Sequence, residues 1–345
     1  MSLHSEISEQ PERIQSLLIN QRQTVEQIAD ALRKRDVSYV FLAARGTSDN
    51  AGRYANYLWG ARNGLPLALA TPSLFTYYQQ PPKLKNALVV GISQSGQSPD
   101  IVSVLEEGRR QNCLTLAITN EPNSPLTQCA DFVLDVQAGP EKAVAATKTY
   151  TTELMTIAML SAALNGDKAD WKELGKVGKW MKQALKQDAL IAQAAQRYRY
   201  MRQCVVLGRG FNYATAFEWA LKLKELTYVE AEPYSSADFQ HGPIAMMERG
   251  FPVMVIAPQG KVFDSLLEVL AQLRREFMAE LLVISNAKRA LSLAQIPVTI
   301  PDDVPEWLTP LVSILPAQLF AYHLTRAKGF DTEAPRSIHK VTATK

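Results

Sequence analysis

The sequence has few of the residues that build disulfide frameworks and metal centres. It contains three cysteines and four histidines in 345 residues. The cysteines are odd in number, widely spaced and set beside apolar runs, which predicts buried thiols rather than disulfides. The histidines show neither H-x-x-x-H nor HExxH spacing, so we expect no metal.

Charge of one sign and long apolar runs are also scarce. Lys+Arg 37 against Asp+Glu 34 leaves a net charge of +3, which is too little for a general nucleic-acid surface. No uninterrupted apolar run reaches membrane-spanning length, and charged side chains interrupt the first twenty residues where a signal peptide would be apolar. The sequence therefore predicts a cytoplasmic protein that binds neither nucleic acid nor membrane.

The common nucleotide-binding motifs are missing as well. Neither G-x-x-x-x-G-K-[ST] nor a G-x-G-x-x-G after a predicted strand occurs. Instead, residues 89–100 run from an apolar strand through a polar turn into a helix start, where Ser98 suits the N-cap and Pro99 the first helical position. The neutral side-chain donors of this turn belong to Ser93, Gln94, Ser95 and Ser98. Such donors at a helix N-terminus predict a sugar-phosphate site, although helix capping in an ordinary polar loop would explain part of the pattern.

An internal repeat defines the fold class. Four apolar strand patterns recur in the same order at a lag of about 165 residues: 39–46 with 204–210, 87–92 with 252–257, 114–120 with 280–286, and 132–136 with 297–301. Helical patterns separate them, as at 51–61, 101–111, 214–228 and 263–278. Alternating apolar strands and helices predict an α/β protein with two tandem, doubly wound parallel sheets.

The repeat also predicts where a ligand binds. Ligands of such sheets bind beyond the carboxyl ends of the strands, where both the 45–48 turn, with Thr47 and Ser48, and the 93–98 turn fall. The matching turns of the second half, 210–212 and 257–260, lack these hydroxyls. We therefore expect one phosphate site per chain.

The same patterns divide the chain. An amphipathic helix is expected at 10–34, and a helical segment rich in Lys, Ala and Gln at 167–196 joins the halves. The expected organisation is a helical segment at 1–36, a first domain at 37–165, a linker at 166–196, a second domain at 197–333 and a tail at 334–345.

Six short motifs carry a family resemblance: they lie at 6–11, 92–96, 144–148, 220–225, 240–243 and 335–340. Over nearly its whole length the chain resembles the sugar isomerase (SIS) domain family, in particular the isomerase domain pair of glutamine–fructose-6-phosphate aminotransferase. The resemblance implies that the phosphate is held by Thr47, Ser93, Gln94, Ser95 and Ser98, and that Val144 and Ala145 line the sugar.

The resemblance also implies catalytic roles. Glu225 would move a proton between C1 and C2, with Lys222 beside it, and Lys340 would be the amine of the tail. His241 would assist ring opening from the neighbouring subunit, which implies a homodimer with shared active sites. His339 stands where the synthases have a small residue, and it could help a water reach the imine.

A plain structural role remains an alternative for these residues. Glu218, Lys222 and Glu225 are spaced i, i+4 and i+7 on one predicted helix, which also fits a solvated row of ion pairs.

The resemblance further suggests the direction of the reaction. The sequence begins where the glutaminase domain of the synthases would end. We therefore expect a deaminase that converts glucosamine 6-phosphate and water into fructose 6-phosphate and ammonia. No cofactor is expected, because the substrate's own amine, once an iminium, supplies the electron sink. The alternatives are a fructosamine-6-phosphate deglycase, another phosphosugar isomerase, a galactosamine-type deaminase, a fragment of a synthase, and a regulator that binds sugar phosphates without turnover.

Overall fold

The computed structural model describes residues 2–338 and residue 340, which form two compact units. We call residues 12–141 and 148–176, with residue 340, the first-sheet unit. Residues 2–11, 142–147 and 177–338 are the second-sheet unit. Two short segments from the first half of the chain thus belong to the unit built mainly by the second half.

Helix α1 (Leu3–Arg33) contributes to both units. The other elements of the first-sheet unit are β1 (Tyr39–Ala43), α2 (Gly46–Asn63), β2 (Leu67–Leu69), α3 (Ser73–Thr76), β3 (Ala87–Ile92), α4 (Pro99–Arg110), β4 (Leu114–Thr119), α5 (Pro125–Gln128), β5 (Phe132–Asp135), α6 (Lys148–Asn165) and α7 (Lys168–Leu174). The second-sheet unit contains α8 (Val177–Ala184), η1 (Leu185–Gln187), α9 (Asp188–Arg197), β6 (Gln203–Gly208), η2 (Gly210–Asn212), α10 (Tyr213–Thr227), β7 (Glu230–Ser235), α11 (Ser236–Gln240), η3 (Pro243–Met246), β8 (Pro252–Ile256), α12 (Phe263–Glu276), β9 (Glu280–Ser285), α13 (Lys288–Leu291), β10 (Ile296–Thr299), η4 (Glu306–Leu308) and α14 (Thr309–Ala327).

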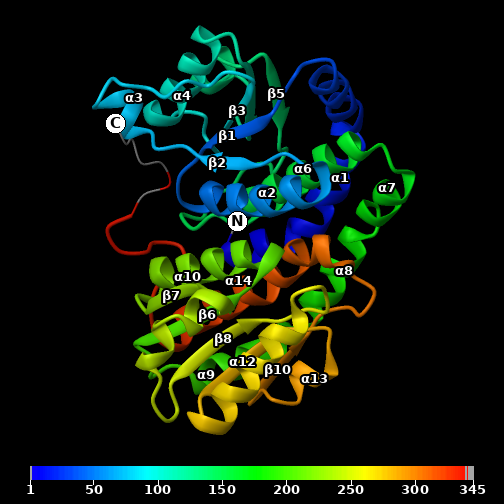
Figure 1. The fold of residues 1–345 in the computed structure, drawn as a ribbon. Coiled ribbons are helices and arrows are strands. Elements are labelled where there is room, and N and C mark those ends of the chain that lie inside the picture. The colour runs from blue at the N-terminus through cyan, green and yellow to red at the C-terminus, as the bar shows by residue number, and fades with distance from the viewer. Residues whose placement is uncertain (1, 339, 341–345) are drawn as a thin grey trace. The chain divides into compact units, whose positions relative to one another are not determined.

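The two sheets repeat one topology, which confirms the predicted fold class. Their strand orders are β2-β1-β3-β4-β5 and, read from the other edge, β7-β6-β8-β9-β10 (Figure 1). All neighbouring strands are parallel. The sequence analysis missed the edge strands β2 and β7, because β2 has only three residues and β7 carries Glu230, Glu232 and Pro233 instead of an apolar run.

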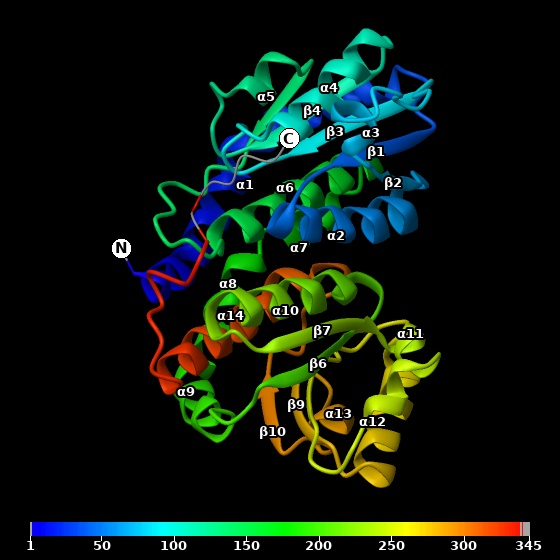
Figure 2. The same cartoon turned by 90° about the vertical axis from the view of Figure 1, so that its left-hand side faces the viewer.

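Helices cover both faces of the first sheet, so its central strands are buried on both sides. Every residue of β3 is buried. On one face, Ile101 and Leu105 of α4 pack in one cluster with Phe41 and Val89 of the sheet. Helices α2 and α6 cover the other face (Figure 2), where the Trp59 indole donates to the Ile157 carbonyl at 3.2 Å.

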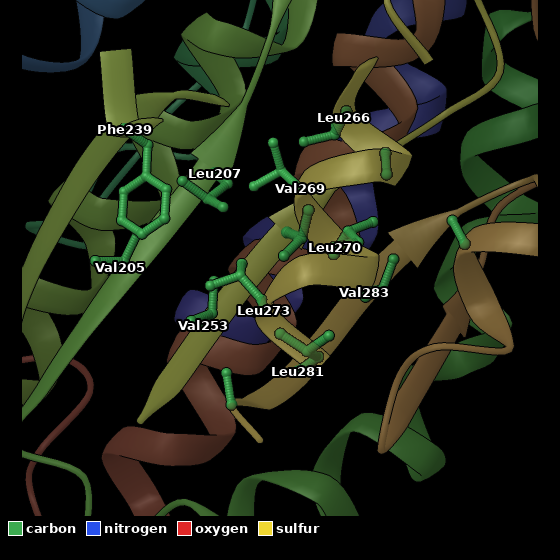
Figure 3. Packing of buried hydrophobic residues seen from close by; sticks show 14 of the residues in the cluster. Val205, Leu207, Phe239, Val253, Leu266, Val269, Leu270, Leu273, Leu281 and Val283 are labelled. Atoms are coloured by element: carbon green, nitrogen blue, oxygen red, sulfur yellow. The ribbon is translucent and has the colours of Figure 1, made fainter. Parts of the chain in front are cut away.

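The second sheet is covered in the same way. Helices α10 and α14 lie on one face and α12 on the other. Figure 3 shows Leu266, Leu270 and Leu273 of α12 in one cluster with Val253 and Val283 of the sheet. Both crossover patterns predicted for this half are therefore helices, α10 and α12.

Three details differ from the sequence-based expectations. Helix α1 begins at Leu3 rather than residue 10, because Leu3 and Ile7 are fully buried and continue its apolar face. The 167–196 segment forms the separate helices α7, α8 and α9 with η1. Cys113 and Cys204 are buried as expected, but Cys129 is only half-buried.

Burial raises the pKa of the Cys204 thiol to about 12, so this thiol stays protonated at neutral pH.

Within residues 2–338 and 340, no helix combines the length and the hydropathy needed to cross a bilayer.

Candidate active site

The strand order places a topological switch point between β1 and β3. From β1 the chain continues to the edge strand β2, whereas from β3 it continues to β4 and β5 on the other side. The turns after β1 and β3 lead into α2 and α4, so both helix N-termini begin at this edge of the first sheet. Open α/β sheets bind their ligands at this position. The predicted phosphate residues of the 45–48 and 93–98 turns therefore lie in one part of the first-sheet unit.

Internal hydrogen bonds give the 93–98 turn a fixed shape. The hydroxyl of Ser93 accepts from the Gly96 N–H at 3.1 Å, and that of Ser95 accepts from the Gln97 N–H at 3.3 Å. Gly96 has a φ of +60°, and a Cβ there would lie 2.0 Å from Ser124 Oγ. Both hydroxyls accept these bonds with lone pairs and retain their own protons as donors.

The helix start after this turn was predicted correctly. Ser98 is the N-cap of α4, and Pro99 is its first residue. Ser98 is half-buried, and its side chain makes no capping hydrogen bond within the described chain. The hydroxyl is thus available at the N-terminus of α4, where the helix dipole favours an anion.

The two hydroxyls of the 45–48 turn have different surroundings. Thr47 is half-buried in the first turn of α2. The Ser48 hydroxyl is buried and donates to the Glu153 carboxylate of α6 at 2.8 Å. Since a hydroxyl has one proton, Ser48 is the weaker candidate for donating to a phosphate.

Sequence reasoning missed Arg45 as a component of this site. Arg45 is the N-cap of α2, and its Nε donates to Asp100 Oδ2 at 2.7 Å. The Asp100 side chain is fully buried in the first turn of α4, whereas the Arg45 side chain is half-exposed. A guanidinium is therefore fixed at the N-terminus of α4, beside the turn of neutral donors. The available signal was its position directly after an apolar strand and before Gly46-Thr47-Ser48.

The corresponding turn of the second sheet is already filled by the chain. After β8, the Lys261 N–H donates to Glu306 Oε1 at 3.0 Å. A Cβ on Gly260 would lie 2.1 Å from the carboxyl carbon of Glu306, so this carboxylate rests directly on the turn. Arg209 after β6 is the repeat counterpart of Arg45, and it donates to Ser265 of α12 at 2.9 Å. The turn after β8 therefore holds an internal carboxylate, that of Glu306.

Three charged residues, two of them buried, form a row on α10. Lys222 Nζ lies 2.6 Å from Glu225 Oε2 and 3.4 Å from Glu218 Oε1. The side chains of Lys222 and Glu218 are buried, while that of Glu225 is 24% exposed. The solvated row considered as an alternative is therefore wrong. Only Glu225 presents its carboxylate to solvent.

Charge pairing determines the protonation state of Lys222. Burial alone would lower the pKa of its ammonium, but the carboxylates of Glu218 and Glu225 outweigh burial and raise this pKa above the usual lysine value. Lys222 is therefore a fixed positive charge beside Glu225, and it is not a neutral amine that could attack a carbonyl.

His241 lies in the same unit, at the end of α11. It is exposed, and its backbone N–H donates to the Asp238 carbonyl at 3.1 Å. Within the part of the chain that the structure describes, its imidazole makes no hydrogen bond or ion pair. The structure does not pair it with Glu225.

The 142–147 segment, which carries Val144 and Ala145, is anchored by α1. Glu6 is fully buried, and its Oε1 accepts from the Lys142 N–H at 2.7 Å and from the Ala143 N–H at 3.5 Å. Val144 is half-buried and Ala145 is buried. The 6–11 motif thus has a structural role, since it holds the segment that is expected to line the sugar.

The tail lysine has a partner in the first-sheet unit. Lys340 Nζ lies 2.7 Å from Oε2 of Glu141, whose side chain is buried. The same carboxylate accepts from the Thr149 N–H at 3.1 Å and from the Thr149 hydroxyl at 2.7 Å, at the start of α6. His339 lies outside the described residues, so its predicted role has no structural test.

One cluster has the composition of a metal site. Across residues 2–338 and 340, the only group of three His, Cys, Asp or Glu side chains with converging ligand atoms is His4, Asp188 and His323. The residues are far apart in sequence, so the spacing rules applied above could not detect them. None of them belongs to the sites described so far.

These features belong to a known family. The chain is a member of the SIS domain family, which matches residues 34–163 and 198–327. Each match contains one five-stranded sheet with its crossover helices.

The chain is similar to curated relatives over about half of their length. It is 33% identical over 344 residues to glutamine–fructose-6-phosphate aminotransferase [isomerizing] of Thermococcus kodakarensis, covering 97% of this chain and 56% of the relative. It is 34% identical over 341 residues to the protein of the same name from Aquifex aeolicus, again covering 97% and 56%.

Solved structures agree with this assignment. A protein of Silicibacter pomeroyi, provisionally described as a phosphosugar isomerase, matches with a TM-score of 0.88 and 33% identity, covering 96% of this chain and all of the other. The C-terminal domain of glucosamine-fructose-6-phosphate aminotransferase from Francisella tularensis matches with a TM-score of 0.86 and 28% identity, covering 96% and 98%. Glucosamine-6-phosphate deaminase from Thermotoga maritima, at a TM-score of 0.78 and 18% identity, covers both chains fully and shares the fold.

Proposed function

We propose that this chain is a phosphosugar isomerase of the SIS type that deaminates glucosamine 6-phosphate to fructose 6-phosphate and ammonia. The similarity to aminotransferases that act as isomerases supports the isomerase part of the proposal. The finer assignment rests on the chemistry of the residues in each unit.

The phosphate of the substrate is assigned to the 93–98 turn and the N-terminus of α4. Ser93, Ser95 and Ser98 supply hydroxyl donors there, and the helix end supplies backbone N–H groups. Arg45 adds a cation that Asp100 holds in place at 2.7 Å. The turn thus combines neutral donors, which fit the phosphate oxygens, with a guanidinium whose remaining N–H groups can donate to a phosphate.

The observation that carries the catalytic proposal is the Lys222–Glu225 pair. Glu225 is a partly exposed carboxylate, and the buried ammonium of Lys222 lies 2.6 Å from it. A carboxylate in this setting suits general-base catalysis, because the neighbouring ammonium stabilises negative charge that develops on the substrate. In the proposal, Glu225 removes the proton from C2 of the open-chain sugar and returns it to C1.

The remaining steps balance without a further reactant except water. The aldehyde at C1 becomes a CH₂OH group as the amine at C2 becomes an imine, so this step is an isomerisation. Water then adds to the imine carbon and ammonia leaves, which gives the C2 ketone. Deamination is the direction that needs only water, whereas synthesis of the amino sugar needs a nitrogen donor.

Ring opening and assembly complete the proposal. His241 is exposed and has no side-chain partner in the described chain, which suits a residue donated to the active site of a second subunit. We therefore propose a homodimer with shared active sites. Lys340, held on Glu141, and His339 are assigned to the tail that approaches the imine.

A coupled assay for ammonia and fructose 6-phosphate tests the proposal. The wild-type chain should release both products from glucosamine 6-phosphate in equal amounts. Glu225→Gln keeps the shape of the side chain but cannot accept the proton, so kcat should fall by about 10²–10⁴-fold with KM little changed. The matched control is Glu232→Gln, an exposed carboxylate of β7 whose partner is the exposed Lys224 at 3.7 Å, and it should keep full activity.

Two outcomes would overturn the assignment. Release of the amine from fructosamine 6-phosphates, without release of ammonia from glucosamine 6-phosphate, would replace the deaminase with a deglycase. An unchanged kcat in Glu225→Gln would remove Glu225 as the base.

A further inference from the structure

Three residues from distant parts of the sequence meet on the second-sheet unit. His4 lies in the first turn of α1, Asp188 is the first residue of α9, and His323 lies in α14. His4 Nε2 is 2.9 Å from Asp188 Oδ2, and His323 Nε2 is 2.6 Å from Asp188 Oδ1. The three ligand atoms all lie within 4.8 Å of one another.

The donor set matches the preferences of a divalent transition metal. Two imidazole nitrogens and one carboxylate are ligands that zinc binds at about 2.0–2.2 Å, usually with four ligands in a tetrahedron. The carboxylate offsets one of the two positive charges of the ion. The spacing is close enough that small side-chain rotations would bring all three atoms around one ion.

The surroundings leave room for these rotations and for a fourth ligand. The side chains of His4 and Asp188 are 35% and 36% exposed, while that of His323 is 14% exposed. The ring of Tyr322 packs against both imidazoles, with ring centroids 5.1 Å from His4 and 5.0 Å from His323. The cluster is thus packed on one side and open to water on another.

We propose that His4, Asp188 and His323 bind one divalent transition-metal ion, with zinc as the best match, and that water completes its coordination. The cluster is already organised without the ion. Both imidazoles already lie within hydrogen-bond distance of the Asp188 carboxylate, at 2.9 Å and 2.6 Å. Binding requires each imidazole to be neutral with its ring proton on Nδ1, so that Nε2 is free to bind the ion.

The proposed ion has a structural consequence within this unit. It would join the first turn of α1 to α9 and α14, where the Leu3 N–H already bonds to the Glu333 carboxylate at 3.1 Å. Residues 2–11 carry Glu6, which anchors the 142–147 segment. The site would therefore stabilise the attachment of a segment that positions Val144 and Ala145.

Calorimetric titration of the full chain with zinc chloride, after treatment with a chelator, tests the proposal. Wild type should bind one ion per chain, and binding should weaken at least tenfold in His323→Gln and in His4→Gln. His241→Gln is the matched control, since it removes an exposed histidine outside the cluster and should leave zinc binding unchanged. The side chain of His4 is more exposed than that of His323, so we expect His4→Gln to disturb the fold less. His4→Gln therefore keeps the test valid if His323→Gln fails to fold.

Absorption of the Co²⁺-loaded protein provides a second measurement. Wild type should show the intense visible bands of a four-coordinate site, and His4→Gln should lose them. The proposal fails if wild type binds no stoichiometric ion, or if both cluster variants bind as tightly as the control. In that case the cluster is a pair of hydrogen bonds that secures α1 without a metal.

Discussion

Replacing Lys222 by methionine separates the structural role of the buried ammonium from its proposed catalytic role. Methionine has a similar length and no charge, so packing on α10 should change little. The substitution leaves the carboxylate of Glu218, whose side chain is fully buried, without the ammonium that lies 3.4 Å away in wild type. Removing one partner of a buried ion pair typically costs about 3–5 kcal/mol. We expect Lys222→Met to lose stability in this range at neutral pH.

The pH dependence of this loss follows from the carboxyl group that remains. Without the ammonium, burial should raise the folded-state pKa of Glu218 above the unfolded value of about 4.3. An acid whose pKa is raised by folding binds more protons in the folded state than in the unfolded state. The free energy of unfolding of Lys222→Met should therefore fall as the pH rises from the unfolded pKa of Glu218 to its folded pKa. The difference between Lys222→Met and wild type should therefore shrink as the pH is lowered toward about 4.5.

The assay is urea unfolding at several pH values, with activity measured on the same samples. The double variant Lys222→Met/Glu218→Gln should recover most of the lost stability, because no carboxylate remains buried at residue 218. It should not recover activity, because Glu225 still lacks its ammonium. The reasoning is refuted if Lys222→Met is as stable as wild type at neutral pH, or if the double variant regains both properties.

The remaining predictions concern substrate binding and assembly. Ser95→Ala should raise KM for the phosphorylated sugar through loss of a hydrogen bond of roughly 1.5–3 kcal/mol to a charged acceptor; an unchanged KM would exclude Ser95 from the phosphate site. Arg45→Ala should raise KM further and reduce the preference for phosphorylated over unphosphorylated sugar. Arg45→Lys keeps the charge but not the planar geometry, so it should recover only part of the loss. Equal preference in wild type and Arg45→Ala would contradict the assignment. Mixing Glu225→Gln chains with His241→Ala chains should restore part of the activity through hybrid sites, and no recovery after demonstrated subunit exchange would place both residues in one chain.

The sequence alone was sufficient for the architecture, because apolar strands and their periodic repetition are local signals. Four of the five strands in each repeat follow from apolar runs, such as 87–92 in the first repeat and 252–257 in the second. The order of strands and helices predicts parallel sheets. The start of α4 at Pro99 also followed from local chemistry, since a serine N-cap and a proline at the first position define a helix start. The edge strand β7 did not follow, because pairing with β6 overrides its polar composition.

The tertiary structure decided which polar residues are buried and which of them meet. Helical spacing placed Glu218, Lys222 and Glu225 on one face of α10, but it could not show that this face is buried. Likewise, Arg45 and Asp100 are fifty-five residues apart, and His4 and His323 lie near opposite ends of the chain. Sequence periodicity records contacts within one helix or strand, whereas these contacts depend on how separate elements pack. The sequence thus determined the fold and the family motifs, and folding determined the charged partners that give those motifs their chemistry.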